Sequence, residues 1–337
     1  MADISDVARL AGVSNATVSR ALSGRGPVSP TTQIKVREAA RQLGYAVSPN
    51  ASGLASGRTA TVGVVVPFLT SWFYTAVIEG AQAELVTRGY DVTLYNLMGS
   101  GDQRAAVFEK SLARKRVDAV IAVSLELTDA ELGSLNAMGK PVVGVGGPLE
   151  GVPTISIDDV AVATLATSHL IALGHRRIAH LGGDPEWERD FHVPSNRRQG
   201  YEAALREAGI EVDPALFFPT EFGIESGYRS TKRMFSDPRH VPTAIMAASD
   251  EMAIGAMLAA RDLGLRVPHD LSIVGIDDYR LSEFHGLTTV AQYPARQGRA
   301  AAQMVMRMLA GEVVEAAPVD YDLIVRSSTA RPPAPEG

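Results

Sequence analysis

Residues 6–22 decide the fold of the amino-terminal part of the chain, and they read Asp6-Val7-Ala8-Arg9-Leu10-Ala11-Gly12-Val13-Ser14-Asn15-Ala16-Thr17-Val18-Ser19-Arg20-Ala21-Leu22. Apolar residues recur at i, i+3, i+4 and i+7 from Ile4 to Ala11, which predicts a helix that ends at Gly12. Ser14 is placed to cap a second helix that ends near Leu22. The stretch therefore predicts two short helices joined by a tight turn.

A third helix is expected over residues 30–43. Ser29 and Pro30 supply a cap and a first-turn proline, and Gly44 ends the helix. Two short helices around a glycine-containing turn, braced by a third, form a helix-turn-helix, whose second helix can enter the major groove of DNA. A small three-helix bundle whose polar face only meets solvent has the same periodicity, so the pattern alone leaves both interpretations open.

The charge distribution is uneven along the chain. Residues 1–60 carry seven basic and three acidic side chains, a formal charge of +4, whereas the remainder carries −10 and the whole chain −6. A small basic segment on an acidic body is typical of a module that binds a polyanion. On its own this asymmetry is a weak indication of nucleic-acid binding.

Composition limits the class of protein. The 337 residues are 46% hydrophobic and 21% charged, which is typical of a soluble globular chain of two or three domains. The absence of cysteine excludes disulfides, thiolate metal sites and cysteine catalysis. No apolar run is long enough to span a membrane and the first residues do not resemble an export signal, so a cytoplasmic protein is expected.

From residue 61 onward, strand-like and helix-like patterns alternate. Apolar runs predict strands at residues 61–66, 90–95, 117–123, 141–145, 178–181, 244–247 and 271–275, with short ones near 319 and at 323–325. Helices are expected at residues 73–88, 102–114, 128–138, 159–173, 195–208, 223–235, 250–263 and 295–309. Two such series predict an α/β body of two doubly wound parallel-sheet lobes, with a cleft outside the carboxyl ends of the strands.

Catalytic and cofactor motifs are missing from this body. The run from Gly144 to Gly147 lacks the third glycine of the dinucleotide fingerprint, and neither a Walker sequence, a Gly-x-Ser-x-Gly elbow nor a His-Glu-x-x-His helix occurs. We therefore expect neither an enzyme nor a protein with a cofactor or a catalytic metal.

Residues 6–22 resemble the DNA-binding head of LacI/GalR-family regulators, residues 28–45 resemble the third helix of that head, and the similarity continues to about residue 330. The resemblance implies a small all-α helix-turn-helix domain followed by a periplasmic-binding-protein-like body of type I. The implied domains are 1–46 (head), 47–60 (hinge), 61–330 (body) and 331–337 (disordered tail). Within the body the lobes are expected at 61–158 with 290–319 and at 159–289 with 320–330.

The resemblance also implies which head residues contact DNA. Asn15, Ala16 and Arg20 correspond to positions that read bases, and their chemistry suits adenine, a thymine methyl and guanine, respectively. Phosphate contacts, which position the head without reading sequence, are expected from other polar side chains of the first two helices. These are Ser5, Ser14, Thr17 and Ser19.

The hinge holds one further DNA contact. Its helix is too short to be stable alone in water, and in the family it forms only when two copies meet on DNA. Leu54 corresponds to the leucine that wedges into the minor groove, with Ala51 beside it. The alternative is that Leu54 is an ordinary apolar linker residue. Ser52 stands where the family commonly has arginine, which puts one phosphate contact in doubt.

The family's effector site carries over onto the cleft residues Phe73, Arg197, Phe222, Ser249 and Asp277. An arginine and an aspartate can grip adjacent sugar hydroxyls while aromatic rings cover the C–H face. Other interpretations stay open: Arg197 can pair with Glu202 on a solvated face, Asp277 can cap the following turn, and the two phenylalanines can belong to the core. Gly146 and its neighbour Gly147 stand where the family often has an aspartate and a larger residue, so one hydroxyl acceptor is missing.

The resemblance implies a dimeric transcriptional regulator that binds a near-palindromic operator, most often as a repressor, under the control of a small sugar or sugar-like ligand. The alternatives are a solute-binding protein without DNA regulation and an enzyme of doubly wound fold. The basic head argues against the former and the missing catalytic motifs against the latter.

Overall fold

The computed structural model forms two compact units, residues 1–61 and 62–337. It describes residues 2–23, 26–45, 58–97, 101–112, 116–125, 127–147, 149, 151–183, 192–315 and 319–333. Most of the predicted hinge, including Ala51 and Leu54, lies outside these ranges, as do the last four residues of the predicted tail.

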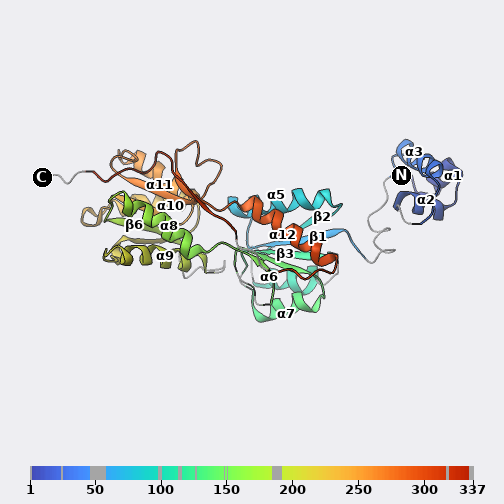
Figure 1. The fold of residues 1–337 in the computed structure, drawn as a ribbon, viewed down its shortest axis with the longest axis horizontal. Coiled ribbons are helices and arrows are strands. Elements are labelled where there is room, and N and C mark those ends of the chain that lie inside the picture. Colours follow the sequence, from blue (N-terminus) through green and yellow to red (C-terminus); the bar gives the residue numbers. More distant parts are fainter. Residues whose placement is uncertain are drawn as a thin grey trace. The chain divides into compact units, whose positions relative to one another are not determined.

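The first unit consists of three helices, α1 (Ile4–Ala11), α2 (Asn15–Ser23) and α3 (Pro30–Gln42) (Figure 1). The Asp3 carboxylate accepts hydrogen bonds from the backbone N–H groups of Ser5 and Asp6 and so caps α1. Gly12 ends α1 with a φ of +67°, a conformation that glycine adopts without strain. Small and β-branched apolar side chains from all three helices form the core of this unit. The three predicted helices are confirmed.

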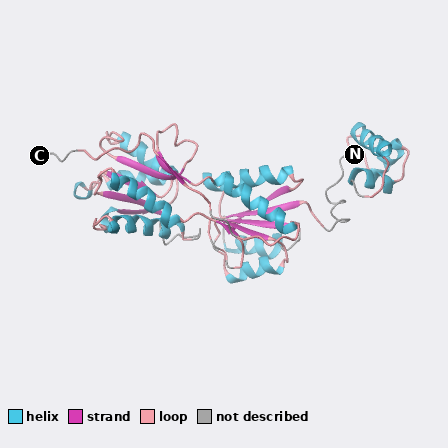
Figure 2. Cartoon of the chain, in the orientation of Figure 1, coloured by secondary structure: helices cyan, strands magenta, loops and turns pink. Residues whose placement is uncertain are grey.

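The second unit contains two largely parallel sheets, each flanked by helices (Figure 2). The first sheet has the order β2-β1-β3-β4-β5, with β1 (Thr61–Val66), β2 (Asp91–Asn96), β3 (Ala119–Val123), β4 (Val142–Val145) and β5 (Thr154–Ile155). The second has the order β11-β10-β9-β8-β6-β7, with β6 (Ile178–Gly183), β7 (Phe217–Thr220), β8 (Ala244–Ala247), β9 (Ser272–Asp277), β10 (Thr288–Ala291) and β11 (Asp322–Ile324). Strand β11 runs antiparallel to β10. The predicted two-lobed α/β body is confirmed.

Helices cover both sheets. They are α5 (Trp72–Thr87), α6 (Gly101–Ala106), the π-helix η1 (Val107–Leu112), α7 (Asp129–Ala137), α8 (Asp159–Ala172), α9 (Val193–Glu207), α10 (Ile224–Met234), α11 (Asp250–Asp262) and α12 (Pro294–Leu309). Two short 3₁₀ turns lie at Pro214–Leu216 and Pro238–His240. The helix expected at residues 102–114 is thus an α-helical turn followed by a π-helix.

The late helix α12 packs on the first sheet, although the strands before and after it in the chain belong to the second. Ala301, Ala302 and Val305 share a buried core with the valines of β1 and β3. Gly80 of α5 and Gly298 of α12 let the two helices approach closely, because a Cβ at either position would overlap the partner's backbone. The chain therefore crosses between the lobes after β5, after β10 and again before β11.

Two strands of the second sheet, β7 and β10, were not predicted. Residues 319–321 are described without strand structure, so the strand expected near 319 is not found among the described residues there; residues 316–318 lie outside the described ranges. In β7, Pro219 weakens the strand pattern, and its position is tolerated because β7 is at the edge of the sheet.

Candidate functional site

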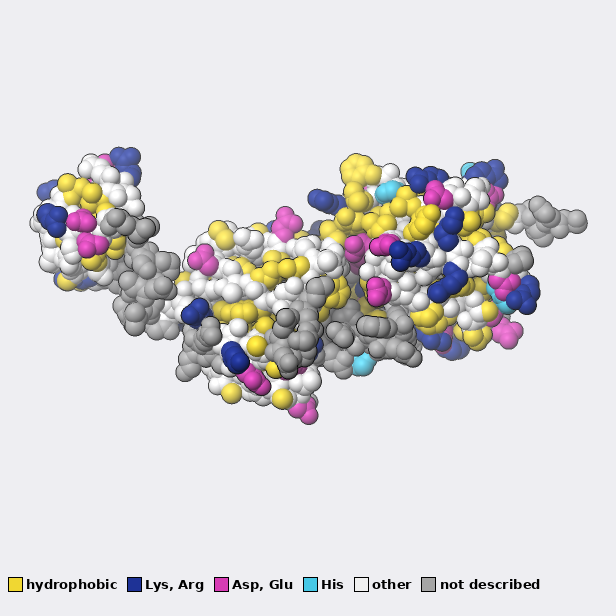
Figure 3. Space-filling view, turned by 180° about the vertical axis from the view of Figure 1, so that it is seen from behind, with side chains coloured by type: hydrophobic (Ala, Val, Ile, Leu, Met, Phe, Trp, Pro, Cys, Tyr) yellow, Lys and Arg dark blue, Asp and Glu magenta, His cyan; other side chains and the backbone are white. Residues whose placement is uncertain are grey.

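The exposed face of α2 carries the three side chains predicted to read bases. Asn15, Ala16 and Arg20 are exposed, whereas Val18 and Ala21 of the same helix are completely buried. The Arg20 Nε–H donates to the carbonyl oxygen of Ala16 at 3.1 Å. The helix thus buries one face against α1 and α3 and exposes the opposite face to solvent. Basic side chains lie at the surface of this unit, at the left of Figure 3.

The residues predicted to contact phosphates surround the start of α2. The Ser14 hydroxyl accepts a hydrogen bond from the backbone N–H of Thr17 at 3.2 Å, as an N-cap does. The Asn15 side-chain amide donates to the Ser5 hydroxyl at 3.3 Å, which joins α2 to the start of α1. Ser19 is exposed. The structure brings all seven predicted head residues onto α1 and the segment from Ser14 through α2.

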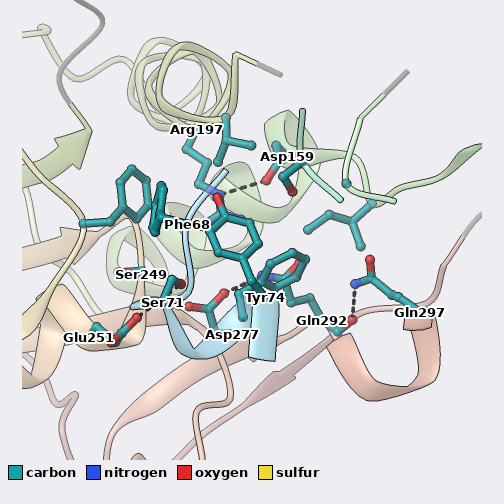
Figure 4. Close-up of a pocket in the computed structure, with 16 residues that line it drawn as sticks. Phe68, Ser71, Tyr74, Asp159, Arg197, Ser249, Glu251, Asp277, Gln292 and Gln297 are labelled. Carbon is teal, nitrogen blue, oxygen red and sulfur yellow. Dashed lines mark hydrogen bonds and ion pairs between the residues drawn. The ribbon is translucent and has the colours of Figure 1, made fainter. Parts of the chain in front are cut away.

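A cavity lies between the two lobes of the second unit, at the carboxyl ends of their strands (Figure 4). Its empty space, which includes open solvent, is about 590 Å³. Its lining includes all five residues that the sequence predicted for ligand binding: Phe73, Arg197, Phe222, Ser249 and Asp277. Ser124 and Gly146 follow strands of the first sheet, and Asp277 ends β9 of the second. The structure therefore assembles one polar pocket from residues that lie far apart in sequence.

Arg197 is held by a buried ion pair. Its Nε–H donates to Asp159 Oδ1 at 2.8 Å, and its Nη1 donates to the carbonyl oxygen of Ala248. The exposed fractions of the two side chains are only 6% and 9%. Burial raises the pKa of Asp159, and the nearby guanidinium opposes that rise. The alternative pairing with Glu202 is wrong, because Glu202 pairs with Arg198 and Arg206 instead.

Asp277 lies at the end of β9 with a φ of +132°, a backbone conformation that side-chain-bearing residues rarely adopt. Its carboxylate accepts from the side-chain amide of Gln292. Burial raises its pKa to about 8, an effect that the Arg197 charge opposes and the Asp250 charge reinforces. The interpretation of Asp277 as a turn cap is wrong, since the N–H of Tyr279 donates to Asp250 at 2.8 Å.

Asp250 holds the polypeptide around this strand end. Its completely buried carboxylate accepts from the hydroxyls of Ser282 and Thr289, each at 2.6 Å. Burial raises its pKa to about 6, although these hydrogen bonds oppose the shift. The preceding residue, Ser249, caps α11 through a hydrogen bond from the backbone N–H of Met252 at 3.3 Å. These contacts fix the cavity wall that contains Asp277.

Aromatic rings form the apolar wall. Phe68 and Phe73 each meet the Tyr74 ring edge to face, with centroids 4.9 Å and 5.7 Å away, respectively. Phe73 packs against the core of the first lobe and Phe222 against that of the second, and both also line the cavity. The core and ligand interpretations of these two phenylalanines are therefore compatible.

Contacts join the two lobes at the mouth of the cavity. Glu251 of the second lobe accepts from the backbone N–H of Trp72 at 3.4 Å and from the Ser71 hydroxyl at 3.5 Å. The rings of Trp72 and Tyr279 lie 5.1 Å apart. Burial raises the pKa of Glu251. Because each of these contacts joins a residue of one lobe to a residue of the other, they form only when the two lobes are close together.

Sequence reasoning missed several lining residues. They are Phe68, Ser71, Tyr74, Ser124, Ile157, Asp159, Val193, Glu251, Gln292 and Gln297. Asp159 could have been noticed as an acid in the first turn of α8, opposite Arg197 of α9. Gln292 follows β10, a strand that was not predicted, so no pattern pointed to it.

Within the described parts of the chain, no cluster of His, Asp and Glu side chains is arranged to hold a metal ion. None of the helices in those parts is long and apolar enough to cross a membrane.

Comparison with known families and proteins identifies the chain. Residues 3–50 match bacterial regulatory proteins of the lacI family, and residues 167–329 match a periplasmic binding protein-like domain. Catabolite control protein A of Priestia megaterium is 34% identical over 317 residues, which cover 93% of this chain and 94% of that protein. The chain belongs to the lacI family. The repressor CytR of Escherichia coli strain K12 is 33% identical over 334 residues, covering 97% of this chain and 96% of the relative.

Solved lacI-family structures share the whole fold. The lac repressor dimer bound to operator and the anti-inducer ONPF superposes with a TM-score of 0.83 at 28% identity, covering 98% of this chain and 99% of that one. The complex of the regulator CelR with cellobiose gives a TM-score of 0.71 at 33% identity, covering 97% and 100%. The interpretation as a DNA-binding transcriptional regulator is confirmed, and the solute-binding and enzyme alternatives are set aside.

Proposed function

We propose that this lacI-family regulator is a cytoplasmic repressor that binds a near-palindromic operator as a homodimer and responds to a small neutral sugar in the cleft of its body. The observation that carries the proposal is the convergence of Arg197, Asp277 and the aromatic wall on one cavity. A cavity with this lining suits a ligand with hydroxyls at one face and C–H groups at the other.

In this proposal α2 reads the operator. Asn15, Ala16 and Arg20 contact base edges, while Ser5, Ser14, Thr17 and Ser19 contact phosphates. The exposure of the first three side chains and the cap at Ser14 support this division. A two-fold dimer presents this surface twice, so the operator is expected to contain two related half-sites.

The proposed hinge, residues 47–60, connects the head 1–46 to the body 61–330. There Leu54 wedges into the minor groove, with Ala51 beside it, when two hinges meet on DNA. An inserted apolar side chain kinks the duplex, so Leu54→Ala is expected to reduce operator bending and to leave ligand binding nearly unchanged. A gel-phasing assay with unchanged bend angles would contradict the wedge.

The balance of charges in the cavity favours a neutral ligand. Three carboxyl groups, Asp159, Glu251 and Asp277, line it together with one guanidinium, Arg197. Because that guanidinium is already paired with Asp159, and the described lining holds no other cationic side chain, an anionic ligand would find no unpaired positive charge. Ser249 and the carboxyl of Asp277 can instead accept from hydroxyls. Relatives solved with cellobiose and with ribose agree with this chemistry.

Control of DNA affinity follows from lobe closure in this proposal. A ligand that contacts both lobes stabilises their closed arrangement, in which Glu251 meets Ser71 and Trp72. Any ligand that favours one arrangement shifts the population of both, and the hinges and heads respond to that shift.

The test combines DNA selection with ligand screening of the intact protein. We expect a random duplex library to yield a near-palindrome, and a thermal-shift screen of neutral sugars to yield a ligand that changes affinity for it. Asp277→Ala should abolish the ligand's effect on DNA binding while the protein stays folded. Asp129→Ala, at an exposed position of α7, is the matched control. Failure to enrich any sequence, or a normal ligand response in Asp277→Ala, would contradict the proposal.

A further inference from the structure

The cavity wall formed by α12 contains a buried glutamine. Gln297 lies in the first turns of this helix, which begins at Pro294, and only 1% of its surface is exposed. It lines the cavity together with Gln292, which precedes the helix (Figure 4). An amide side chain in such a place must satisfy one donor group and one acceptor oxygen away from bulk water.

The orientation of this amide is determined by its partner. Gln297 Nε2 donates to the backbone carbonyl oxygen of Gln292 at 2.7 Å. A carbonyl oxygen only accepts, so the nitrogen of the amide has to face it and Oε1 has to point the other way. Figure 4 shows this arrangement, with the nitrogen of Gln297 turned toward Gln292 and its oxygen turned away.

The Gln297 Oε1 atom is buried and has no hydrogen-bond partner among the described residues. Leaving a buried acceptor unsatisfied costs about 1–3 kcal/mol. Such atoms are rare in folded proteins, and one that lines a cavity can be satisfied by a molecule that enters it. That molecule must supply a donor, because the amide oxygen only accepts.

One residue positions this oxygen and the carboxylate of Asp277 together. The side chain of Gln292 donates to Asp277, and its backbone carbonyl accepts from Gln297. Gln292 is itself buried, with 3% of its surface exposed. Two acceptor groups are therefore held on the cavity wall by a single buried residue, so their spacing is fixed before a ligand arrives.

From this arrangement we infer that Gln297 is a specificity-determining residue of the effector site, whose Oε1 accepts a hydrogen bond from one hydroxyl of a neutral polyhydroxylated ligand while Asp277 meets another. The inference rests on the proposed function, because it needs the cavity to be the effector site. It adds to that function that the cavity wall formed by α12 determines ligand specificity. A molecule without a donor on this side leaves the amide oxygen unpaired and binds more weakly.

The test uses the intact protein and isothermal titration with D-glucose, D-ribose and cellobiose, followed by singly deoxygenated derivatives of whichever binds. Gln297→Leu removes the acceptor, and Gln297→Met does so while keeping an unbranched chain, in case the first variant is unfolded. Gln303→Leu is the matched control, because Gln303 lies on the same helix at an exposed position. The expected result is a loss of about threefold to tenfold in affinity for the Gln297 variants only.

The deoxygenated derivatives identify the contact. One of them should bind the wild-type protein more weakly than the parent sugar, and the same derivative should suffer no further loss in Gln297→Leu. Unchanged affinity of the folded Gln297 variants for the parent sugar would overturn the inference and leave the proposed function intact, since Oε1 would then face only water. Equal binding of every derivative to the wild-type protein would also overturn it. If none of the three sugars bound the wild-type protein, the sugar-effector proposal and this inference would fail together.

Discussion

Arg197 and Asp159 form a buried ion pair beside the cavity, with Nε and Oδ1 2.8 Å apart. The arginine comes from α9 and the aspartate from the first turn of α8, directly after the chain enters the second lobe. The pair fixes the plane of the guanidinium, and a second bond to the carbonyl of Ala248 anchors the group to the segment that follows β8. The side chain that we propose to recognise the ligand thus also holds the second lobe together.

Because the pair is buried, removing one partner should destabilise the protein strongly. Arg197→Leu is expected to lower the free energy of unfolding by about 3–5 kcal/mol at pH 7, since it leaves the Asp159 charge buried and unpaired. Replacing both residues by leucine should recover most of the loss. Urea denaturation of the wild-type protein and of these two variants measures this.

Arg206→Ala provides the matched control for the buried pair. Arg206 pairs with Glu202 at 2.6 Å, but 61% of its side chain is exposed. An exposed pair contributes about 0–1 kcal/mol, so its loss should be small. A similar destabilisation by Arg197→Leu and Arg206→Ala would show that the buried pair has no special role.

His180 should make the second lobe sensitive to acid. It is completely buried in β6 between the rings of Tyr201 and Phe217, and its Nδ1–H donates to the carbonyl of Met246 at 3.1 Å. Burial lowers its pKa from 6.5 to about 4. The unfolded chain therefore binds a proton as pH falls below 6.5, while the folded chain does so only near pH 4, and stability is lost across that window.

The size of this acid effect follows from the shift of the pKa. The contribution of His180 to the loss of stability between pH 6.5 and 4 is about 3 kcal/mol. His180→Phe, which keeps an aromatic ring between Tyr201 and Phe217, should reduce the pH dependence of the free energy of unfolding, measured by urea denaturation, by that amount. The exposed His269→Gln variant is the control. If the free energy of unfolding of His180→Phe fell with pH as steeply as that of the wild-type protein, His180 would not be the source of the acid sensitivity.

The same substitution, glycine to alanine, should have opposite effects at Gly298, in the contact between α5 and α12, and at Gly133 in α7. A Cβ at Gly298 would overlap the carbonyl of Val77, so Gly298→Ala should cost about 1–3 kcal/mol of stability. Gly133 in α7 has open space around it, and Gly133→Ala should stabilise the protein by up to about 1 kcal/mol through helix propensity. Thermal unfolding compares them, and stabilisation by both substitutions would contradict the close helix approach.

The exposed arginine of α2 predicts a change in base preference. Arg20→Ala should cost about 1–3 kcal/mol on the selected operator and relax the preference at one symmetric base pair. Arg41→Ala, on the exposed side of α3, is the control. Fluorescence anisotropy with selected and random duplexes measures both variants. Equal weakening of Arg20→Ala on the two DNAs would mean that this side chain contacts only phosphate.

The sequence predicted the head and the strand-helix alternation because local patterns specify them. The caps at Asp3, Ser14 and Ser29 and the stop at Gly12 act over three or four residues, so they are visible without tertiary structure. Strand β10 was missed because its first two residues, Thr288 and Thr289, are polar and interrupt the apolar pattern, although both are buried in the fold. Strand β7 was missed because Pro219 is unfavourable in any strand except one at an edge.

The cavity was predicted only in part, for a related reason. Arg197, Asp277 and the phenylalanines belong to motifs that can be compared with a family. The positions of their partners depend on how the chain returns from one lobe to the other. These partners are Asp159, Gln292 and Gln297. Long-range packing, not local periodicity, brings these side chains to Arg197 and Asp277. Their proximity therefore cannot be predicted from the spacing of residues in the sequence.

The central claim is that one ligand in the cleft and one operator at the heads are coupled. It is tested most directly by measuring the dissociation constant of the selected operator with and without saturating sugar, and that of the sugar with and without operator. The account predicts that the two constants change by the same factor, about 5–150-fold. A sugar that binds the cavity tightly and leaves operator affinity unchanged would contradict it.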